Sequence, residues 1–341
     1  MNYKILFTSK NNYDLLENWV NRCSNYKTPD IINLDLGSDP DQYKKGCDFC
    51  QKNNIEFIKA ERTEFQHNIK QVFDYLENNK MGYILYLHQD CFPVNESSFV
   101  KINYSIENNN LSKFGCIGFN IYHDIEIKHL KENNLRLMTT SRCILQKGNG
   151  YYMRFPKGSR VNYNKFIKNK AFSVENIMWT ALLLSSKSFA KNIEIDLNFN
   201  FFFSPDDLAY QFLYNNVHNV FIPGIHFIHD QSIKTKYQLP KDSPLGKKED
   251  VVKRYGRVDH AKIWKNKWGF IYDPTKYIQI LNNRIIKYFL SRLASKFYSS
   301  CETKTRKEYK NAKLKSHLMD DYFNHDPING PLKYFDLKLQ E

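Results

Sequence analysis

The segment that most constrains the fold is the run YILYL at residues 83–87, which is apolar throughout and leads directly into His88, Gln89 and Asp90. A strand with one solvated face alternates apolar and polar residues, whereas a strand covered by helices on both faces stays apolar. Other strand-like runs alternate with segments of helical spacing; the strands are expected at 4–8, 31–36 and 55–59, and the helices at 14–23, 42–53 and 69–76. This order predicts an α/β fold with a parallel sheet between helices.

The pattern continues along the chain and then changes character. A helix is expected at 97–108, a strand at 114–121, a helix at 207–214 and a strand at 220–228, while 174–184 is an apolar stretch. Residues 122–170 are polar and aromatic without periodicity, which predicts a long functional loop region. After residue 231 Lys, Asp and Pro become frequent, so we expect a first domain over 1–235 and a basic, mainly helical region over 236–341.

Charge and cysteine usage narrow the class of protein. The net charge of +14 over 341 residues implies an anionic partner, although an AT-rich genome would also enrich lysine. The amino terminus has no signal-peptide pattern and no apolar run approaches the roughly 20 residues of a membrane span, so a cytoplasmic protein is expected. The odd number of cysteines, seven, suits reduced thiols, and Cys47 and Cys50 form a CxxC without the second pair that a zinc site needs.

Polar side chains follow the predicted strands at three places, residues 35–39, residues 88–90 and His229, and an acidic pair stands at 206–207. Ligands of open α/β sheets bind at the carboxyl ends of the strands. A carboxylate such as Asp90 at that edge needs a cation or hydrogen bonds to offset its desolvation. Two simpler interpretations stay open: Asp90 caps a following helix, and the acidic pair is favoured by a helix start after Pro205.

Five segments in the same order resemble glycosyltransferase family 2 and its bacterial relatives with a GT-A fold. They are KILFTSKN, LDLGSD, YILYLHQD, FFFSPDDLAYQF and FIPGIHFIHDQS, spread over residues 3–232. The resemblance implies a GT-A domain with a basic helical C-terminal extension. It implies an enzyme that moves a sugar from a nucleotide diphosphate sugar to a glycan or lipid-linked glycan in bacterial surface polysaccharide synthesis, with inversion and with Mn²⁺ or Mg²⁺.

The resemblance also assigns the donor site. HQD is similar to the DxD metal motif of that family, in a subgroup that carries HQD, so Asp90 is the expected metal ligand and His229 completes the site. His226 is a competitor, but strand alternation places it on the opposite face from His229. The residues expected to bind the donor nucleotide are Thr8, Asp35, Ser38, Asp39, Asn68, His88 and Gln89.

The acidic pair of SPDDLAY is similar to the family's catalytic pair, which makes Asp207 the expected base and Asp206 its support. A carboxylate within hydrogen-bond reach of the acceptor hydroxyl can take its proton during attack. The sequence departs from the family pattern at His88, which replaces the first Asp, and at Ala209 and Phe212, where a third acid and an Arg are usual. These departures motivate an alternative, a GT-A-like protein that binds glycan or a partner without catalysis.

The carboxyl-terminal region carries an amphipathic pattern over 278–296, with lysines and arginines continuing over 304–315. Such a helix either docks on its own domain or lies on an anionic membrane surface. A third class of function, binding of single-stranded nucleic acid, would use the aromatic and basic residues of 151–172. Because the sequence contains no recognised nucleic-acid-binding signature, we expect no nucleic-acid partner.

Overall fold

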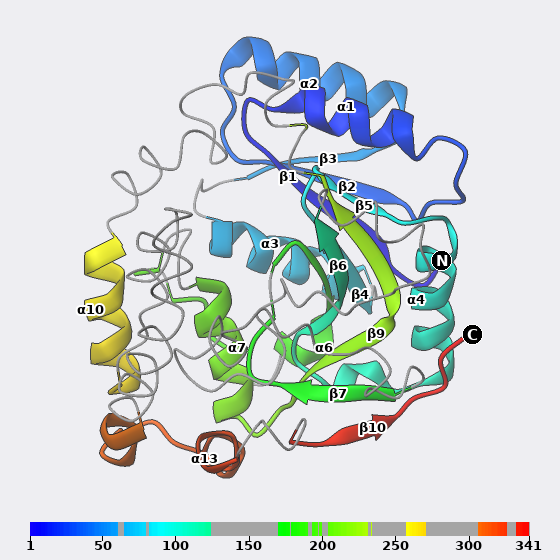
Figure 1. The fold of residues 1–341 in the computed structure, drawn as a ribbon. Coiled ribbons are helices and arrows are strands. Elements are labelled where there is room, and N and C mark those ends of the chain that lie inside the picture. Colours follow the sequence, from blue (N-terminus) through cyan, green and yellow to red (C-terminus); the bar gives the residue numbers. More distant parts are fainter. Residues whose placement is uncertain are drawn as a thin grey trace, which may run out of the picture.

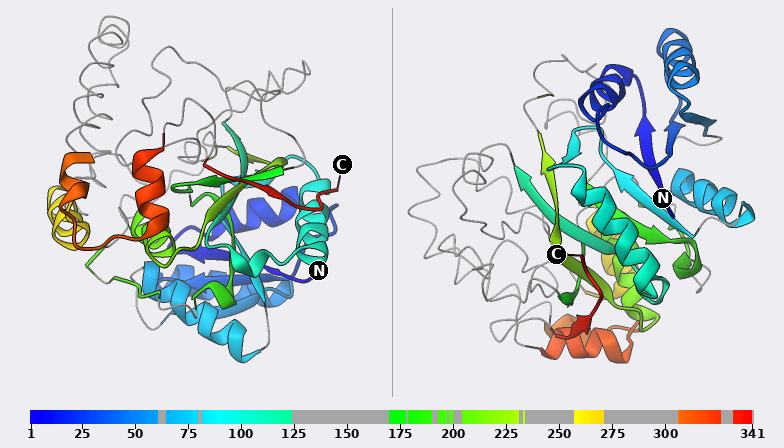
Figure 2. Two further views of the ribbon diagram at one scale, coloured as in Figure 1. Left: turned by 90° about the horizontal axis from the view of Figure 1, so that it is seen from below. Right: turned by 90° about the vertical axis from the view of Figure 1, so that its right-hand side faces the viewer.

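The computed structural model describes residues 1–60, 65–79, 82–123, 170–177, 179–189, 193–196, 198–199, 204–230, 233, 257–270, 306–325 and 332–340. The predicted loop region over 122–170 lies almost entirely outside these residues, as do the expected domain boundary near 236 and the amphipathic segment 278–296. The described residues form a twisted sheet with helices on both faces (Figures 1 and 2).

The sheet has ten strands in the described part of the chain, in the order β10-β7-β9-β6-β8-β4-β1-β2-β3, with β5 paired to β9. Parallel pairing joins β3, β2, β1 and β4 in turn, and also joins β6 to β9; the remaining pairs are antiparallel. The strands are β1 Lys4–Ser9, β2 Ile31–Asp35, β3 Glu56–Lys59, β4 Tyr83–Leu87, β5 Cys91–Pro93, β6 Ile117–His123, β7 Lys170–Val174, β8 Ala181–Ser185, β9 Asn219–His229 and β10 Tyr334–Asp336.

Helices cover the sheet on both faces, and the alternation of side chains along β1 shows why. Ile5 and Phe7 pack in a core with residues of α1 and α4, whereas Leu6 between them packs in a second core with residues of α3 and α7. The predicted α/β fold, a sheet flanked by helices, is therefore confirmed, and the sheet is mixed because antiparallel pairs join its parallel parts. The helices are α1 Tyr13–Arg22, α2 Pro40–Lys52, α3 Phe65–Asn78, α4 Ser97–Asn108, the short η1 Leu111–Lys113, α6 Ser186–Phe189, α7 Ser204–Tyr214, α10 Arg257–Trp268 and α13 His317–Asn324.

The predicted elements of the first 121 residues are all present, with shifts of a few residues at their ends. The apolar stretch 174–184 divides into the end of β7 and most of β8, with a bend at Glu175 and a turn at Trp179 and Thr180 between the two strands. Two short strands, β5 and β10, had not been predicted. Each has only three residues, too few to show a periodic pattern.

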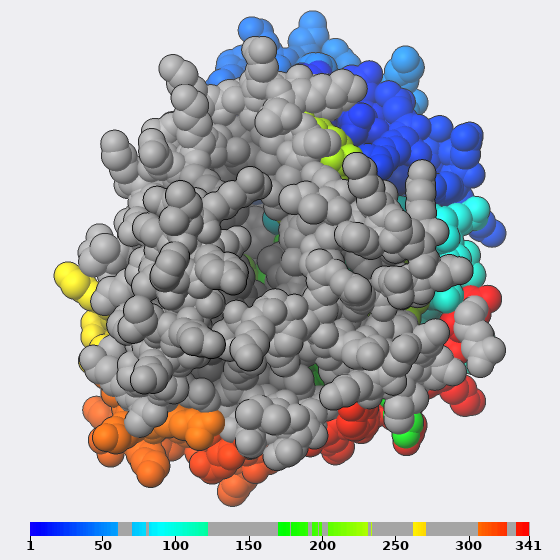
Figure 3. Space-filling model, viewed as in Figure 1, coloured from blue at the N-terminus to red at the C-terminus, as the bar shows by residue number. Residues whose placement is uncertain are grey.

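The described parts of the carboxyl-terminal region pack against the α/β domain. Aromatic and aliphatic side chains of α10, of residues 306–314 and of α13 form one core with Tyr210 and Leu213 of α7. The last strand, β10, pairs with β7 and so belongs to the same sheet. In the space-filling view the α1–α2 layer and residues 306–325 lie at opposite edges of the molecule (Figure 3). None of the described helices combines the length and the apolar character of a membrane span.

Candidate active site

The carboxyl ends of β4 and β9 meet because β5 turns back from β4 and pairs with β9. The chain leaves β4 at Leu87 and turns through His88 and Asp90, where the amide N–H of Cys91 donates to the carbonyl of His88 at 2.9 Å. Cys91 then pairs with His229 in the antiparallel β5–β9 register. A further backbone hydrogen bond, from the N–H of Asp230 to the carbonyl of Asp90, measures 2.8 Å. The backbone therefore holds Asp90 beside His229.

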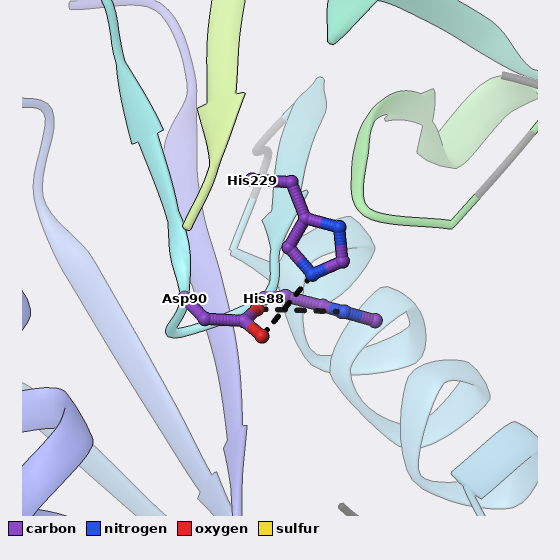
Figure 4. Close-up of side chains that lie close together, drawn as sticks. All are labelled: His88, Asp90 and His229. Carbon is purple, nitrogen blue, oxygen red and sulfur yellow. Dashed lines mark hydrogen bonds and ion pairs between the residues drawn. The ribbon is translucent and has the colours of Figure 1, made fainter. Parts of the chain in front are cut away.

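The side chains of His88, Asp90 and His229 converge, and we call these three residues the triad (Figure 4). Nε2 of His229 lies 3.1 Å from one carboxylate oxygen of Asp90, and Nδ1 of His88 lies 3.9 Å from the other. The candidate ligand atoms all lie within 4.8 Å of one another. Asp90 and His229 are buried and His88 is half-buried, so the group opens on the side of His88.

The donor set of the triad suits a divalent metal ion with affinity for both nitrogen and oxygen. Two imidazoles and one carboxylate are typical ligands of first-row transition ions, whereas Mg²⁺ prefers an all-oxygen shell. The triad could therefore hold such an ion. The simpler interpretation of Asp90 as a helix cap is wrong, because β5 follows it directly and the next helix, α4, begins only at Ser97.

His226, the competitor of His229, lies away from the triad. It is three residues earlier on β9, and its Nδ1 lies 3.4 Å from the side-chain amide of Asn120 on β6. Alternation along the strand thus separates the two histidines as expected from the sequence.

Asp35 lies at the end of β2 and organises the turn that follows. One carboxylate oxygen accepts the N–H groups of Gly37 at 3.0 Å and Ser38 at 3.1 Å, and the other accepts the hydroxyl of Tyr13 at 2.6 Å. Gly37 has a φ of +80°, a left-handed conformation that glycine adopts without a steric cost. Burial and the carboxylate of Asp35 raise the pKa of Tyr13, so its phenol stays a donor.

The other predicted donor residues surround the same strand ends. Asp39 accepts the side-chain amide of Asn11 at 2.8 Å. Thr8 on β1 is half-buried, and its hydroxyl lies 3.4 Å from that of Tyr86 on β4. Asn68 belongs to α3, but its side chain lies outside the described residues.

Gln89 differs from its neighbours in the turn formed by His88, Gln89, Asp90 and Cys91, which we call the HQD turn. Its side chain is buried and points back into the protein, where the amide donates to Oγ of Ser9 at 2.6 Å and its oxygen accepts from Asn12 at 2.7 Å. The side chains of His88 and Asp90 instead turn toward His229.

The acidic pair lies in the first turn of α7, and both carboxylates are buried. Asp206 accepts a hydrogen bond from the side-chain amide of Asn176. Asp207 accepts from Nζ of Lys267 at 2.8 Å, from the indole of Trp268 at 2.8 Å and from Gln211 at 2.7 Å. Burial raises the pKa of Asp207, and Lys267 partly opposes that shift.

Lys267 and Trp268 had not been identified from the sequence. They end α10, whose sequence RVDHAKIWKNKW has no catalytic motif, and they come from a part of the chain about 60 residues beyond Asp207. The signal that this sequence does offer is the spacing of Trp264 and Trp268, which lie one helical turn apart and mark a buried face of α10.

A cavity lies beside Asp207, and no residue of the triad lines it. It is lined by residues that include Asp207, Gln211, Asp196 and Trp179. The ring centroid of Trp179 lies 5.8 Å from that of Tyr86, which in turn lies 5.7 Å from that of His88. Two aromatic rings thus separate the cavity from the triad.

Comparisons with known proteins show the fold. No protein-family model matches this sequence. A search of curated proteins likewise finds no match. The structure is similar to that of GalNAc-T7 with UDP, GalNAc and Mn²⁺, with a TM-score of 0.50, 13% identity, 95% of this chain covered and 58% of that one. A mannosyltransferase, PcManGT from Pyrobaculum calidifontis in complex with GDP-Man and Mn²⁺, matches with a TM-score of 0.44 and 9% identity, over 89% of this chain and 74% of that one.

The chain spans 58% of the length of GalNAc-T7, a GT-A glycosyltransferase. At this level of identity the likeness shows a shared architecture, so the fold of this chain is GT-A-like.

Proposed function

We propose that this protein is a metal-dependent glycosyltransferase that moves a sugar from a nucleoside diphosphate donor to a glycan or lipid-linked glycan. The observation that carries the proposal is the triad at the carboxyl ends of β4 and β9 in a GT-A-like fold. One strand, β1, separates β4 from β2, which ends at the Asp35 turn. In open α/β sheets this edge is where ligands bind. The Mn²⁺ and nucleotide bound by GalNAc-T7 give the same proposal further support.

In the proposed donor site, His88, Asp90 and His229 hold the ion, and their nitrogen-rich donor set favours Mn²⁺ over Mg²⁺. When bound, such an ion neutralises the diphosphate of the donor and of the departing nucleotide. The nucleoside is assigned to the turn formed by Asp35 and Ser38. Thr8, Asp39 and Asn68 complete the proposed donor set.

In the proposed acceptor site, Asp207 takes the proton of the acceptor hydroxyl, and Asp206 supports Asp207 by joining the first turn of α7 to the side chain of Asn176. Three donors occupy three of the roughly four lone-pair positions of the Asp207 carboxylate, which leaves one for the acceptor. Lys267 favours the ionised form that a base requires. Attack from the side opposite the departing nucleotide would invert the anomeric carbon.

The proposed setting is bacterial surface polysaccharide synthesis at the inner face of the cell membrane, with the protein in the cytoplasm. Four exposed lysines, at positions 307, 310, 313 and 315, lie on the segment that precedes α13. Together with the net charge of +14, they would attract an anionic lipid surface or an acidic lipid-linked acceptor.

The first experiment is a thermal-shift screen of UDP, GDP and their sugar conjugates, with Mn²⁺, Mg²⁺ or EDTA. A ligand at 100 times its Kd adds about 2.7 kcal/mol to the stability of the folded state. We expect stabilisation by one nucleotide family with Mn²⁺, loss of that stabilisation in Asp90→Asn, and an unchanged response in Asp14→Asn, whose carboxylate is exposed on α1. If no nucleotide stabilises the wild type with Mn²⁺, the proposal is wrong.

A second candidate function, a GT-A-like binding protein without catalysis, is favoured by one observation. Asp207 forms an ion pair with Lys267 and accepts two further hydrogen bonds, so three donors already share its buried carboxylate and restrict its access to an acceptor hydroxyl. The two candidates differ in turnover. A nucleotide sugar that binds with Mn²⁺ but is neither transferred nor hydrolysed, equally in wild type and Asp207→Asn, supports the binding protein.

A further inference from the structure

The HQD turn has two sides with different partners. His88, Gln89, Asp90 and Cys91 form a four-residue turn closed by the Cys91 to His88 backbone hydrogen bond. The side chains of the first and third residues belong to the triad. The side chain of the second, Gln89, is 5% exposed and belongs to a separate polar network beneath the turn. The turn is therefore held by its backbone and by one buried amide.

The network beneath the turn runs across β1 to the end of β2. Oε1 of Gln89 accepts from Asn12 at 2.7 Å, and its Nε2 donates to Oγ of Ser9 at 2.6 Å. The single hydroxyl proton of Ser9 goes to Oδ1 of Asn33, also at 2.6 Å. Ser9 and Asn33 are both fully buried. Every bond in this series is short and has a defined direction, so the Gln89 amide has one favoured orientation.

Beyond Asn33 the network reaches the turn assigned to the nucleoside. Nδ2 of Asn33 lies 3.5 Å from the hydroxyl of Tyr13, and that hydroxyl donates to Asp35 at 2.6 Å. A continuous buried polar path thus connects the two turns of the proposed donor site, one at the end of β2 and one at the end of β4.

We propose that Gln89 is a positioning residue for the triad, which it supports through Ser9 and Asn12 by fixing the turn that presents His88 and Asp90 toward His229. This inference rests on the proposed function, because it takes the triad to be a metal site. It differs from the expectation that Gln89 contacts the donor. It has one non-obvious consequence: Ser9, which touches none of the triad residues through a described hydrogen bond, contributes to metal affinity.

The test measures Mn²⁺ binding, which needs no knowledge of the donor or acceptor. Gln89→Met keeps the length of the side chain and removes both hydrogen bonds, and Ser9→Ala removes the hydroxyl that orients the amide. Loss of an outer hydrogen-bonding partner typically weakens metal binding by about 10- to 100-fold. We expect a loss of that size for Gln89→Met and a smaller loss for Ser9→Ala, titrated by the electron paramagnetic resonance signal of free Mn²⁺.

A control separates positioning from general loss of stability. Asn219 is another fully buried side-chain amide with three hydrogen bonds, and it begins β9 at the end opposite His229. Asn219→Leu should lower the melting temperature and leave Mn²⁺ affinity unchanged. The absorption bands of bound Co²⁺ report ligand geometry, and we expect them to change in Gln89→Met and to stay constant in Asn219→Leu.

The outcomes discriminate between the inference and the function on which it rests. Wild-type affinity and an unchanged Co²⁺ spectrum in Gln89→Met would overturn the positioning role and leave the glycosyltransferase proposal standing. Equal losses in Asn219→Leu would overturn it too. If Gln89→Met does not fold, unaltered affinity in Ser9→Ala overturns the inference. A wild type that binds no Mn²⁺ removes the metal-dependent function itself.

Discussion

Replacing Lys267 by methionine tests how the end of α10 is joined to α7. The ammonium group of Lys267 lies 2.8 Å from Asp207 and 2.9 Å from Asp196, and methionine keeps most of its apolar stem. The side chain of Asp207 is 3% exposed, whereas those of Asp196 and Lys267 are 17% and 23% exposed. The substitution therefore leaves one nearly inaccessible carboxylate and one partly solvated carboxylate without their cation.

The expected loss follows from this burial. Removing one partner of a fully buried ion pair costs about 3–5 kcal/mol. Lys267 is partly solvated, and Asp207 keeps its hydrogen bonds from Trp268 and Gln211, so we expect about 2 kcal/mol at pH 8. Lys265→Met on the same helix removes an exposed ion pair, 3.4 Å from Glu308, and should cost under about 0.5 kcal/mol.

The pH dependence gives a second signature. Burial already raises the pKa of Asp207, and removing Lys267 raises it further. A carboxyl group with a raised pKa binds its proton more tightly in the folded state than in the unfolded one. The variant therefore loses stability as the pH rises from the unfolded-state pKa of Asp207 through its folded-state pKa. In the wild type, Lys267 holds the pKa of Asp196 low against the effect of burial, and this contribution also vanishes. The loss in Lys267→Met should therefore be smaller at pH 5 than at pH 8.

Urea unfolding at both pH values, followed by tryptophan fluorescence, measures these differences, because Trp264 and Trp268 lie in the same core. Adding Asp207→Asn to Lys267→Met should recover part of the loss at pH 8. If Lys267→Met and Lys265→Met cost the same, or if the loss does not increase with pH, the ion pair does not stabilise the α7–α10 contact as argued.

Three further substitutions have expected outcomes that thermal or chemical unfolding can check. Gly115→Ala should cost about 2 kcal/mol, because a Cβ there would lie 2.4 Å from the ring of Phe212 in a closely packed core; wild-type stability would show that the core can relax. Ser316→Ala removes the side-chain cap of α13 and a 2.7 Å bond to the carbonyl of Leu213, and should cost about 1 kcal/mol; no loss would show that water replaces both bonds. Burial lowers the pKa of His218 to about 4, so the wild type should lose stability as pH falls from about 6.5 toward 4, and His218→Phe should lose less, unless the ring is protonated in the folded protein.

Much of the fold was predictable because its amino-terminal half obeys simple periodicities. The runs that became β1 to β4 are short and apolar, and the helices between them repeat apolar residues every three or four positions. The join between β7 and β8 was not predictable, since Ile177 and Trp179 in the connecting segment are as apolar as the strands. The strand β10 depends on its pairing with β7, a partner about 160 residues away, and composition does not report such a partner.

The location of the triad was predictable, whereas its surroundings were not. Asp90 follows β4 and His229 ends β9, and strand ends on one edge of a sheet come together. The direction of the Gln89 side chain depends on the geometry of a turn and on Ser9 of a different strand. The ion pair between Asp207 and Lys267 arises from packing of α10 on α7, which no spacing along the chain encodes.

The position of β10 has a practical consequence for work on this protein. Deleting the carboxyl-terminal region would remove the neighbour of β7 and leave the main-chain N–H and C=O groups of that strand open for pairing with another molecule. Aggregation of such a shortened chain would therefore not test whether the carboxyl-terminal region binds a membrane surface or an acceptor. Charge reversal at Lys307, Lys310 and Lys313, which are exposed, leaves the sheet edge covered and probes the basic segment directly.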